Sequence, residues 1–346
     1  MEQDEDSHQQ LSTVSLPRSG RPSKTDEKKK IKLVGEAIKR PIVTLQGLQV
    51  FLASTSQSSK TDKEEEVEDK VDNNLLVPSV SSDQGFVYVD EKYQIGEQLA
   101  NGGLGTIFEG IRKSDKQRVA LKVVEKNGET MILPDEPDPI PLEVGLMKLV
   151  SRHPACPQVI QLLDWCETDT HVVLVLERPE LCQNLHTFIK QRGRIGEPLA
   201  RHFCYQLVRA LQHCESREVF HRDVKPSNIL VLLTTNEIKL IDFGCGDLHE
   251  ETAYEEFCGT KAYAPPECLK NHGYYSSPTT VWTLGLTLAF IVSGHLPFEP
   301  GKNECIFIPS HVSQELQDLL CWCLCYEPED RPGLEEILLH PWMNEK

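Results

Sequence analysis

The sequence has a shortage of positive charge. Its 36 lysine and arginine residues are outnumbered by 53 aspartate and glutamate residues, and the 346-residue chain has a formal net charge of −17. Sequence-independent nucleic-acid binding needs a basic surface, so this balance argues against that function class. An acidic surface suits a basic partner. The alternative is that the carboxylates are simply solvated and bind no partner.

Long apolar runs are also missing. The longest, VWTLGLTLAFIVSG at 281–294, is too short to cross a bilayer comfortably and is typical of a core helix. The stretch MEQDEDSHQQ at 1–10 is acidic and has no apolar centre, so we expect no signal peptide. We therefore expect a cytoplasmic protein that does not associate with membranes. We expect it in the nucleus as well if KKKIK at 28–32 is a localisation signal rather than a solvated charge run.

No C-x-x-C pair occurs among the twelve cysteines. In a chain of this length without secretion, a disulfide framework is not expected. The densest cluster is CWCLC at 321–325. On a helix Cys323 would point away from Cys321 and Cys325, and no neighbouring histidine completes a zinc set. We expect buried helix cysteines here.

Residues 1–85 differ in composition from the rest of the chain. They are rich in Ser, Lys, Glu, Asp and Gln, and KTDKEEEVEDKVDNN at 60–74 is almost wholly polar. Such a segment cannot bury enough apolar surface to offset chain entropy, so we predict a disordered extension with acidic and basic runs. Within it, PIVTLQGLQVFLA at 41–53 is apolar enough for a docking strand or helix.

From Tyr93 onward the pattern indicates regular structure, first strands and later helices. Apolar strand patterns flank a glycine-rich turn from 93 and recur at 118–126, near 159–164, at 171–176, 229–233 and 238–242. Helical spacing appears at 142–150, where Pro141 suits a first turn, and at 198–214. The layout predicts an α+β fold with a small β-rich part containing one main helix and a larger helical part.

Two signals in the β-rich part suggest phosphate chemistry. NGGLG at 101–105 lies in the hairpin turn, where glycines let backbone amides approach phosphates, although glycine hairpins without a ligand are common. VALK at 119–122 places Lys122 among apolar residues, and a buried lysine needs an anion. Glu143 on the following helix can pair with Lys122 while the lysine also holds phosphate oxygens.

The strongest signal is HRDVKPSN at 221–228. It places three groups on one short loop: Asp223 can accept a hydroxyl proton, Lys225 can neutralise a transferring phosphoryl group, and Asn228 can bind Mg²⁺. DFG at 242–244 offers Asp242 as a second metal ligand. Each element alone could be a turn or a cap, so the signal lies in the ordered set.

This ordered set resembles the eukaryotic protein-kinase signature over about 93–342. GTKAYAPPE at 259–267 is similar to the end of an activation segment, and Glu267 and Arg331 match a pair that usually forms a buried ion pair. LERPE, APPE, VWTLG and HPWM narrow the resemblance to the Pim group of serine/threonine kinases. Pro179 in the hinge and Thr280, where most kinases carry an aspartate, agree with that group.

The resemblance implies the bilobal protein-kinase fold, with an N-lobe at 93–176, a hinge at 177–181 and a C-lobe at 182–342. It implies a monomer that uses ATP and Mg²⁺ and phosphorylates Ser or Thr of protein substrates with basic upstream residues. The ATP contacts it assigns are Leu99, Ala100, Asn101, Gly102, Gly103, Leu104, Gly105, Thr106, Ile107, Ala120, Lys122 and Glu177. The catalytic residues it assigns are Asp223, Lys225, Asn228, Lys122 and Glu143, and the metal ligands are Asn228 and Asp242. Thr260 is expected to contact Asp223 and Lys225.

Several positions depart from the family pattern. Pro179 has no amide hydrogen, so we expect adenine to form one hinge hydrogen bond, with the Glu177 carbonyl, rather than two. Ala100 replaces the first glycine of the loop and would weaken ATP closure if its φ were positive. Some of the acidic residues that read substrate arginines in the Pim group are missing, because the matching residues are Asn184, Thr187 and Ser227.

Regulation can be inferred from Arg222, which precedes the catalytic aspartate and normally needs an anion from the activation segment. That segment, 245–260, already carries carboxylates at Asp247, Glu250, Glu251, Glu255 and Glu256. We therefore expect activity without activation-loop phosphorylation, and simple exposure of these acids is the alternative. Two other functions compete with the kinase: a pseudokinase scaffold that binds nucleotide or partners without catalysis, and an interaction protein acting through 1–85.

Overall fold

The computed structural model describes residues 84–102, 105–269, 273–298 and 306–344. Of the predicted N-terminal extension, only its last two residues are among them. The predicted disorder of 1–83, the apolar stretch 41–53 and the basic run 28–32 lie outside the described residues.

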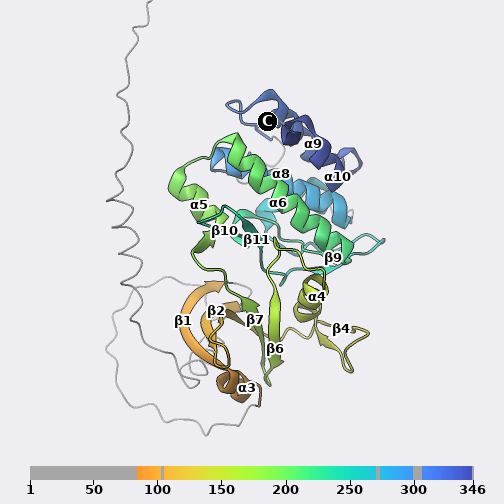
Figure 1. Ribbon diagram of the computed structural model, residues 1–346. Coiled ribbons are helices and arrows are strands. Elements are labelled where there is room, and N and C mark those ends of the chain that lie inside the picture. The colour runs from red at the N-terminus through yellow and green to blue at the C-terminus, as the bar shows by residue number, and fades with distance from the viewer. Residues whose placement is uncertain (1–83, 103–104, 270–272, 299–305, 345–346) are drawn as a thin grey trace, which may run out of the picture. The chain divides into compact units, whose positions relative to one another are not determined.

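A five-stranded antiparallel sheet forms the β-rich part, with strand order β1-β2-β3-β7-β6 (Figure 1). Its strands are β1 (Tyr93–Gly102), β2 (Gly105–Arg112), β3 (Arg118–Glu125), β6 (Leu162–Glu167) and β7 (His171–Glu177). A separate two-stranded pair consists of β4 (Thr130–Met131) and β5 (Ile140–Pro141). The predicted hairpin and third strand are confirmed.

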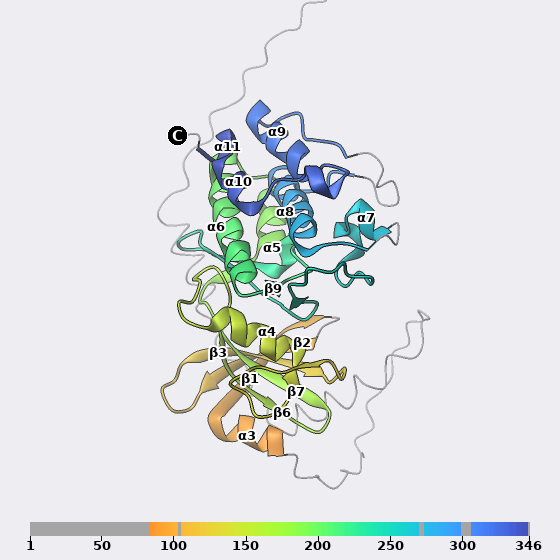
Figure 2. The ribbon, with the colours of Figure 1, turned by 90° about the vertical axis from the view of Figure 1, so that its right-hand side faces the viewer.

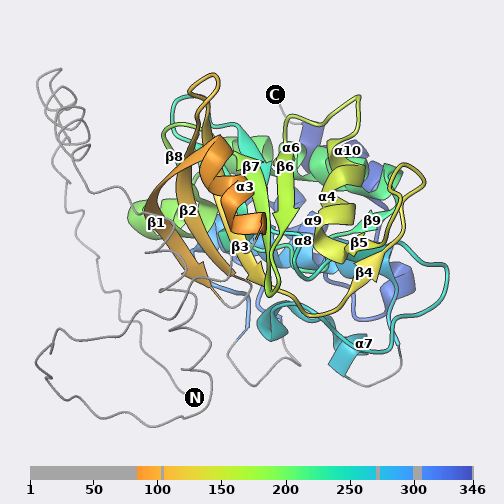
Figure 3. The same cartoon turned by 90° about the horizontal axis from the view of Figure 1, so that it is seen from below.

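Alternation along β7 gives the sheet two buried faces. Val172 and Leu174 pack in the large core together with the apolar side of α4 (Leu142–Ser151). Val173 and Val175 point to the other face, where Val89 of α3 (Gln84–Lys92) is buried with them. Both helices appear beside the sheet in Figure 3. The β-branched run of β7 is therefore buried on both sides, as continuous apolar strands usually are.

Helix α3 was not predicted, because its sequence QGFVYVDEK has no clear helical period. Tertiary contacts hold it instead. The hydroxyls of Tyr88 and Tyr93 both donate to the carboxylate of Asp164 on β6, at 2.8 and 3.1 Å. Burial raises the pKa of Tyr93 well above its ordinary value, so the hydroxyl keeps the proton that it donates.

The strand predicted near 159–164 begins later than expected, at Leu162. The preceding residues pair with β11 (Ile238–Leu240) instead: the Ile160 amide donates to the Leu240 carbonyl at 3.0 Å, and the Leu240 amide donates to the Gln158 carbonyl at 2.7 Å. An apolar run predicts extended chain, but it does not reveal a change of partner within the run.

The larger part is mostly helical, which confirms the predicted α+β bilobal kinase fold (Figure 2). Its helices are α5 (Leu185–Arg192), α6 (Glu197–Ser216), α7 (Pro266–Leu269), α8 (Ser276–Ser293), α9 (Gln314–Cys323), α10 (Leu334–Leu339) and α11 (Pro341–Asn344). Its short strands are β8 (Cys182–Asn184), β9 (Val219–Phe220), β10 (Ile229–Leu232), β11 and β12 (Asp247–Leu248).

The two long helices are held by core packing. On α6 the residues predicted to share one face, Phe203, Leu207, Leu211 and Cys214, are all buried. Helix α8 is buried along most of its length, as its apolar sequence predicted. Among the helices of the described segments, none is both long and apolar enough to span a bilayer.

The Glu267–Arg331 ion pair is confirmed. Two guanidinium nitrogens donate to the two carboxylate oxygens, both at 2.7 Å, and the Arg331 side chain is fully buried. The guanidinium also donates to the carbonyls of Cys325, Tyr326 and Pro278, at 2.9, 3.2 and 3.1 Å. This brace joins α7 to the loop after α9 and to the start of α8.

The cysteine cluster at 321–325 is only partly as predicted. Cys323 is buried, but Cys321 is exposed, and Cys325 lies after the end of α9 and is half-buried. The expectation of buried cysteines was therefore wrong for Cys321, because α9 lies at the surface and turns that residue toward solvent. Within the described ranges, no group of three or more His, Cys, Asp or Glu is arranged to hold a metal ion.

Candidate active site

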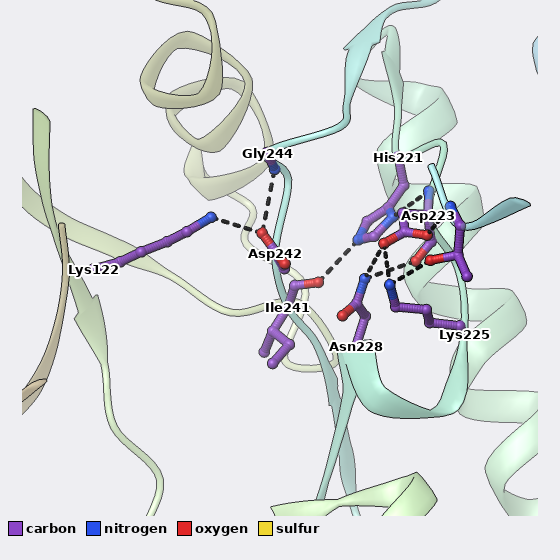
Figure 4. A network of polar contacts seen from close by, with 9 residues as sticks. Lys122, His221, Asp223, Lys225, Asn228, Ile241, Asp242 and Gly244 are labelled. Atoms are coloured by element: carbon purple, nitrogen blue, oxygen red, sulfur yellow. Dashed lines mark hydrogen bonds and ion pairs between the residues drawn. The ribbon is translucent and has the colours of Figure 1, made fainter. Parts of the chain in front are cut away.

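Lys122 lies on β3, between β2 and β7, where it pairs in register with Ile107 and Leu174. Its side chain is 5% exposed and donates to Glu143 of α4 at 2.5 Å and to Asp242 at 2.7 Å. Burial alone would lower the pKa of Lys122, but the two carboxylates outweigh it and raise that pKa. The lysine is therefore held as a cation between the sheet and the DFG motif (Figure 4).

Helix α4 places Glu143 in its first turn. Pro141, expected inside that turn, is the residue just before it, with an extended backbone that also belongs to β5. A proline there costs no helical hydrogen bond, because the first amides of a helix have no partner within it.

Asp223 is buried at the centre of the catalytic loop and accepts several hydrogen bonds (Figure 4). Lys225 donates to one carboxylate oxygen at 2.6 Å, and the side-chain amide of Asn228 donates to the same oxygen at 2.9 Å. The backbone amide of Thr260 donates to the other oxygen at 2.9 Å, and the Lys225 ammonium reaches the Thr260 hydroxyl at 2.5 Å. The predicted Thr260 contact is confirmed.

The environment of Asp223 favours its ionised form. Burial pushes the pKa of the carboxyl up, but the hydrogen bonds from Lys225 and Thr260 and the charge of Lys225 outweigh it and hold the pKa below its ordinary value. The carboxylate is therefore ionised at neutral pH and can accept a proton.

His221 links the catalytic loop to the strand before the DFG motif, a role that was not assigned from the sequence. Its Nε2 hydrogen bonds with the Ile241 carbonyl at 3.0 Å, and its ring lies 4.8 Å from that of Phe243. Burial lowers the pKa of His221, so the ring is neutral at pH 7 and Nε2 donates. The available signal was its position two residues before Asp223 in an apolar context.

Asn228 and Asp242 come from neighbouring segments, because the Ile241 amide donates to the Asn228 carbonyl at 2.9 Å. The Asn228 side chain uses its nitrogen for Asp223, which leaves its amide oxygen for a cation. Asp242 adds a carboxylate, and one of its oxygens accepts from Lys122. Mg²⁺ prefers such oxygen ligands together with substrate phosphates, so these two residues fit the metal.

The glycine-rich turn joins β1 and β2 at the pair Gly102–Gly105. Two of the predicted ATP contacts, Gly103 and Leu104, lie outside the described residues. Gly105 has φ 122°, and a Cβ built there would lie 2.5 Å from the Val123 carbonyl oxygen. Only glycine fits at that position.

The residues before this turn have strand geometry. Ala100 pairs with Ile107 and is not among the described residues with positive φ, so the penalty considered for this alanine does not apply. The Thr106 hydroxyl donates to Asn101 at 3.2 Å across the hairpin, and Leu99 is 46% exposed. Exposed apolar surface at this place is available to a ligand.

The inner wall and the hinge continue from β3 to β7. Ala120 pairs with Leu176, and β7 ends at Glu177. The Glu177 carboxylate accepts from Lys239 at 2.7 Å, which anchors the end of the strand. Pro179 follows in the loop, and its carbonyl accepts from the Cys182 thiol at 3.4 Å.

Arg222 has its anion within the chain. Its guanidinium lies 2.8 Å from the Asp247 carboxylate on β12, and its side chain is 12% exposed. The Tyr254 ring lies 4.6 Å from the guanidinium carbon. Of the acidic residues predicted to serve Arg222, the structure selects Asp247, because β12 pairs with β9 directly before the catalytic loop.

The positions expected to read substrate arginines have other roles. The Asn184 side chain caps α5 by accepting from the Thr187 amide at 2.8 Å. Ser227 is exposed in the short turn that carries Asn228. Neither supplies a negative charge.

A family model, the protein kinase domain, matches residues 93–343. Serine/threonine-protein kinase pim-2 of Danio rerio is 39% identical over 271 residues, covering 75% of this chain and 87% of that protein. Serine/threonine-protein kinase prk-2 of Caenorhabditis elegans is 33% identical over 283 residues, covering 79% and 63%. CBL-interacting protein kinase 28 of Oryza sativa subsp. japonica is 33% identical over 266 residues, covering 73% and 59%.

Proposed function

Because the chain belongs to the protein kinase family and is a Pim-like, ATP-dependent serine/threonine kinase, we propose that it phosphorylates protein substrates without needing a phosphate on its own activation segment. The observation that carries this proposal is the 2.8 Å ion pair between Arg222 and Asp247. Kinases that are switched by phosphorylation use the new phosphate to order the activation segment through arginine. Here the Asp247 carboxylate already forms the ion pair with the Arg222 guanidinium.

The catalytic roles follow from the contacts of the loop. Asp223 orients the substrate hydroxyl and takes its proton, because its carboxylate is ionised and fixed by Lys225, Asn228 and Thr260. Lys225 neutralises charge on the transferring phosphoryl group. Its ammonium, held between Asp223 and Thr260, does not have to reorganise during the step.

The phosphates of ATP are held by the other half of the site. Lys122 carries the positive charge toward them, and Glu143 fixes its direction. Asn228 and Asp242 would hold Mg²⁺, which would neutralise phosphate charge when bound. The apolar walls for adenine are Leu99, Ile107 and Ala120, beside the glycine-rich turn.

The experiment that tests activity is transfer of the γ-phosphate of ATP to a basic serine peptide. The wild-type chain is compared with Asp223→Asn, which keeps the shape of the side chain but cannot take the proton. We expect a loss of at least a hundredfold. Equal transfer by both proteins would favour the pseudokinase alternative, whose only support in the sequence was Ala100.

Independence from phosphorylation is tested with phosphatase-treated protein, checked by mass for the absence of phosphate. We expect full activity, and a roughly tenfold loss in Asp247→Asn, because a hydrogen bond between charged groups contributes about 1.5 kcal/mol. The matched control is Glu251→Gln, an exposed acid of the same segment. An inactive phosphate-free protein, or equal effects of the two variants, would contradict the proposal.

At the hinge, adenine takes one hydrogen bond, with the carbonyl of Glu177, because Pro179 has no amide to donate. Pro179→Ala restores a donor and is expected to tighten ATP binding about fivefold, which corresponds to about 1 kcal/mol. Titration calorimetry with an ATP analogue measures this. Weaker or unchanged binding would sink the single-bond proposal.

The proposal extends to the physiological setting. The acidic chain suits basic substrate peptides, although the preference for upstream arginines is not strict, because Asn184, Thr187 and Ser227 carry no charge. We place the kinase domain at 93–342, with the hinge at 177–181, and expect a monomer that acts in the cytoplasm and the nucleus.

A further inference from the structure

Two cysteines meet at opposite ends of the activation segment. Cys245 follows the DFG motif, and Cys258 directly precedes Gly259 and Thr260. In the structure the Cys245 thiol donates a hydrogen bond to the Cys258 sulfur. Both cysteines are free thiols.

Anchored backbone on both sides holds the two thiols together. Beside Cys245, the Gly246 amide donates to the Phe243 carbonyl at 2.8 Å, and Phe243 is buried. Beside Cys258, Gly259 has φ 127°, and a Cβ built on it would lie 2.8 Å from the Arg222 carbonyl oxygen. The contact therefore joins two fixed points of the fold.

The environments of the two sulfurs differ. The hydrogen bond from Cys245 and the charge of Arg222 lower the pKa of Cys258 to about 7, although burial and the charges of Glu129 and Asp223 oppose this. Two effects raise the pKa of Cys245 well above its ordinary value: the hydrogen bond with Cys258, which is the larger, and burial. A half-buried thiol with a lowered pKa beside a thiol with a raised pKa is the arrangement of a reactive and a resolving cysteine.

We propose that Cys245 and Cys258 are a modification site, at which a peroxide converts the two thiols into a reversible disulfide. This inference does not rest on the proposed function, because it concerns the thiols alone. The Cys258 thiolate attacks one peroxide oxygen, the O–O bond breaks, and the other oxygen leaves as water after protonation. The product is a sulfenic acid on Cys258.

The Cys245 sulfur then attacks the sulfur of this sulfenic acid. The S–O bond breaks, and the hydroxide leaves as a second water with the proton of Cys245. The two thiols together lose two electrons, and one peroxide is reduced to two waters. A dithiol reductant reverses the modification by thiol–disulfide exchange.

The disulfide changes the geometry next to the catalytic loop. The sulfurs must approach to about 2.05 Å, closer than two hydrogen-bonded thiols. Cys258 lies two residues before Thr260, which contacts both Asp223 and Lys225. Oxidation therefore displaces a contact of the catalytic aspartate, and phosphotransfer falls.

The test uses the full chain, treated with hydrogen peroxide, alkylated and digested without reduction. Mass spectrometry is expected to find a peptide pair linked through Cys245 and Cys258, two hydrogens lighter than the free pair and lost after dithiothreitol. Cys245→Ala leaves Cys258 as sulfenic acid, and the exposed Cys321→Ser is the matched control that keeps the link. Two results for the wild-type chain would overturn the proposal. One is an alkylated Cys245 together with a sulfinic acid on Cys258, and the other is disulfide links from these cysteines to various other cysteines.

Activity is the second measurement. Oxidation is expected to lower peptide phosphorylation at least tenfold, with recovery in dithiothreitol, and Cys258→Ala is expected to resist. Thermal melting shows whether that variant is folded, and Cys258→Ser replaces it if it is not. An equal loss in the variant assigns the effect to another thiol and overturns this step. Absence of activity before oxidation would count against the kinase function, while the mass measurement still decides the disulfide.

Discussion

At the scale of single residues, the chemistry depends on charges whose partners are fixed. Asp223 is ionised because three neighbours donate to it, and Lys122 is a cation because two carboxylates face it. Each of these side chains is buried, so loss of one partner leaves a charge that solvent cannot reach. Single substitutions at such places have large, directional effects.

The first prediction concerns pH. The folded pKa of Asp223 lies below its ordinary value, so its stabilising contribution is complete above the unfolded pKa and is lost as the pH falls through the folded pKa. The acid limb of kcat/KM is expected below the ordinary aspartate range. Lys225→Met removes the positive charge that counteracts the effect of burial on the pKa of Asp223. We therefore expect the acid limb to move to higher pH by about one unit. A pH–rate profile measures both, and an unmoved limb would contradict the assigned cause.

The second prediction concerns the brace. Glu267→Ala leaves the fully buried Arg331 without its carboxylate and is expected to lower the free energy of unfolding by about 3–5 kcal/mol. The control is Asp135→Ala, which removes the partner of Arg152 in an exposed pair and is expected to change stability by less than about 1 kcal/mol. Urea denaturation compares them. Similar small effects would show that the brace does not stabilise the fold.

At the scale of elements, backbone geometry sets the shape of the site. The hairpin β1–β2 turns close to β3, where Gly105 leaves no room for a side chain. Helix α4 brings Glu143 to Lys122, and the pairing of β12 with β9 brings Asp247 to Arg222. These elements determine which charged groups meet.

The third prediction concerns the hairpin. Gly105→Ala combines a left-handed backbone with a Cβ 2.5 Å from a carbonyl oxygen, so we expect a loss of about 2–4 kcal/mol in stability and weaker ATP binding. Gly128→Ala is the control, because Gly128 has φ 83° but no atom within 4 Å of the added Cβ. Strain alone costs about 1 kcal/mol there. Equal losses in thermal unfolding would mean that the close approach is unimportant.

At the scale of the whole molecule, we expect the excess of acidic residues to bias which substrates bind. A net charge of −17 attracts basic peptides over several ångströms, and dissolved salt screens that attraction. The charge acts on encounter and binding, whereas the chemical step depends on the buried site.

The fourth prediction follows from this charge. Raising the salt concentration from 50 to 500 mM is expected to increase the KM for an arginine-rich serine peptide several-fold, with little change in kcat. A neutral peptide with the same phosphoacceptor serves as the control. Steady-state kinetics measures both, and an equal response of the two peptides would show that the surface charge does not select substrates.

Sequence and structure agree best where local pattern and motif order coincide. The hairpin, β3, α4 and the face of α6 followed from apolar periodicity, and the candidate site was predicted from four ordered motifs. Helix α3 and the start of β6 did not, because they depend on Asp164 and Leu240, which are distant in the sequence. The exposure of Cys321 likewise depends on how α9 lies on its neighbours.

The fold class, the family and the chemical types of the candidate site residues could be predicted from residue type, spacing and order alone. The folded structure was needed to show that Asp247 is the partner of Arg222, that Ala100 has ordinary strand geometry, and that Cys245 contacts Cys258. These features could not be predicted because ion pairs and thiol contacts act over only a few ångströms. The sequence does not record which distant segments come that close.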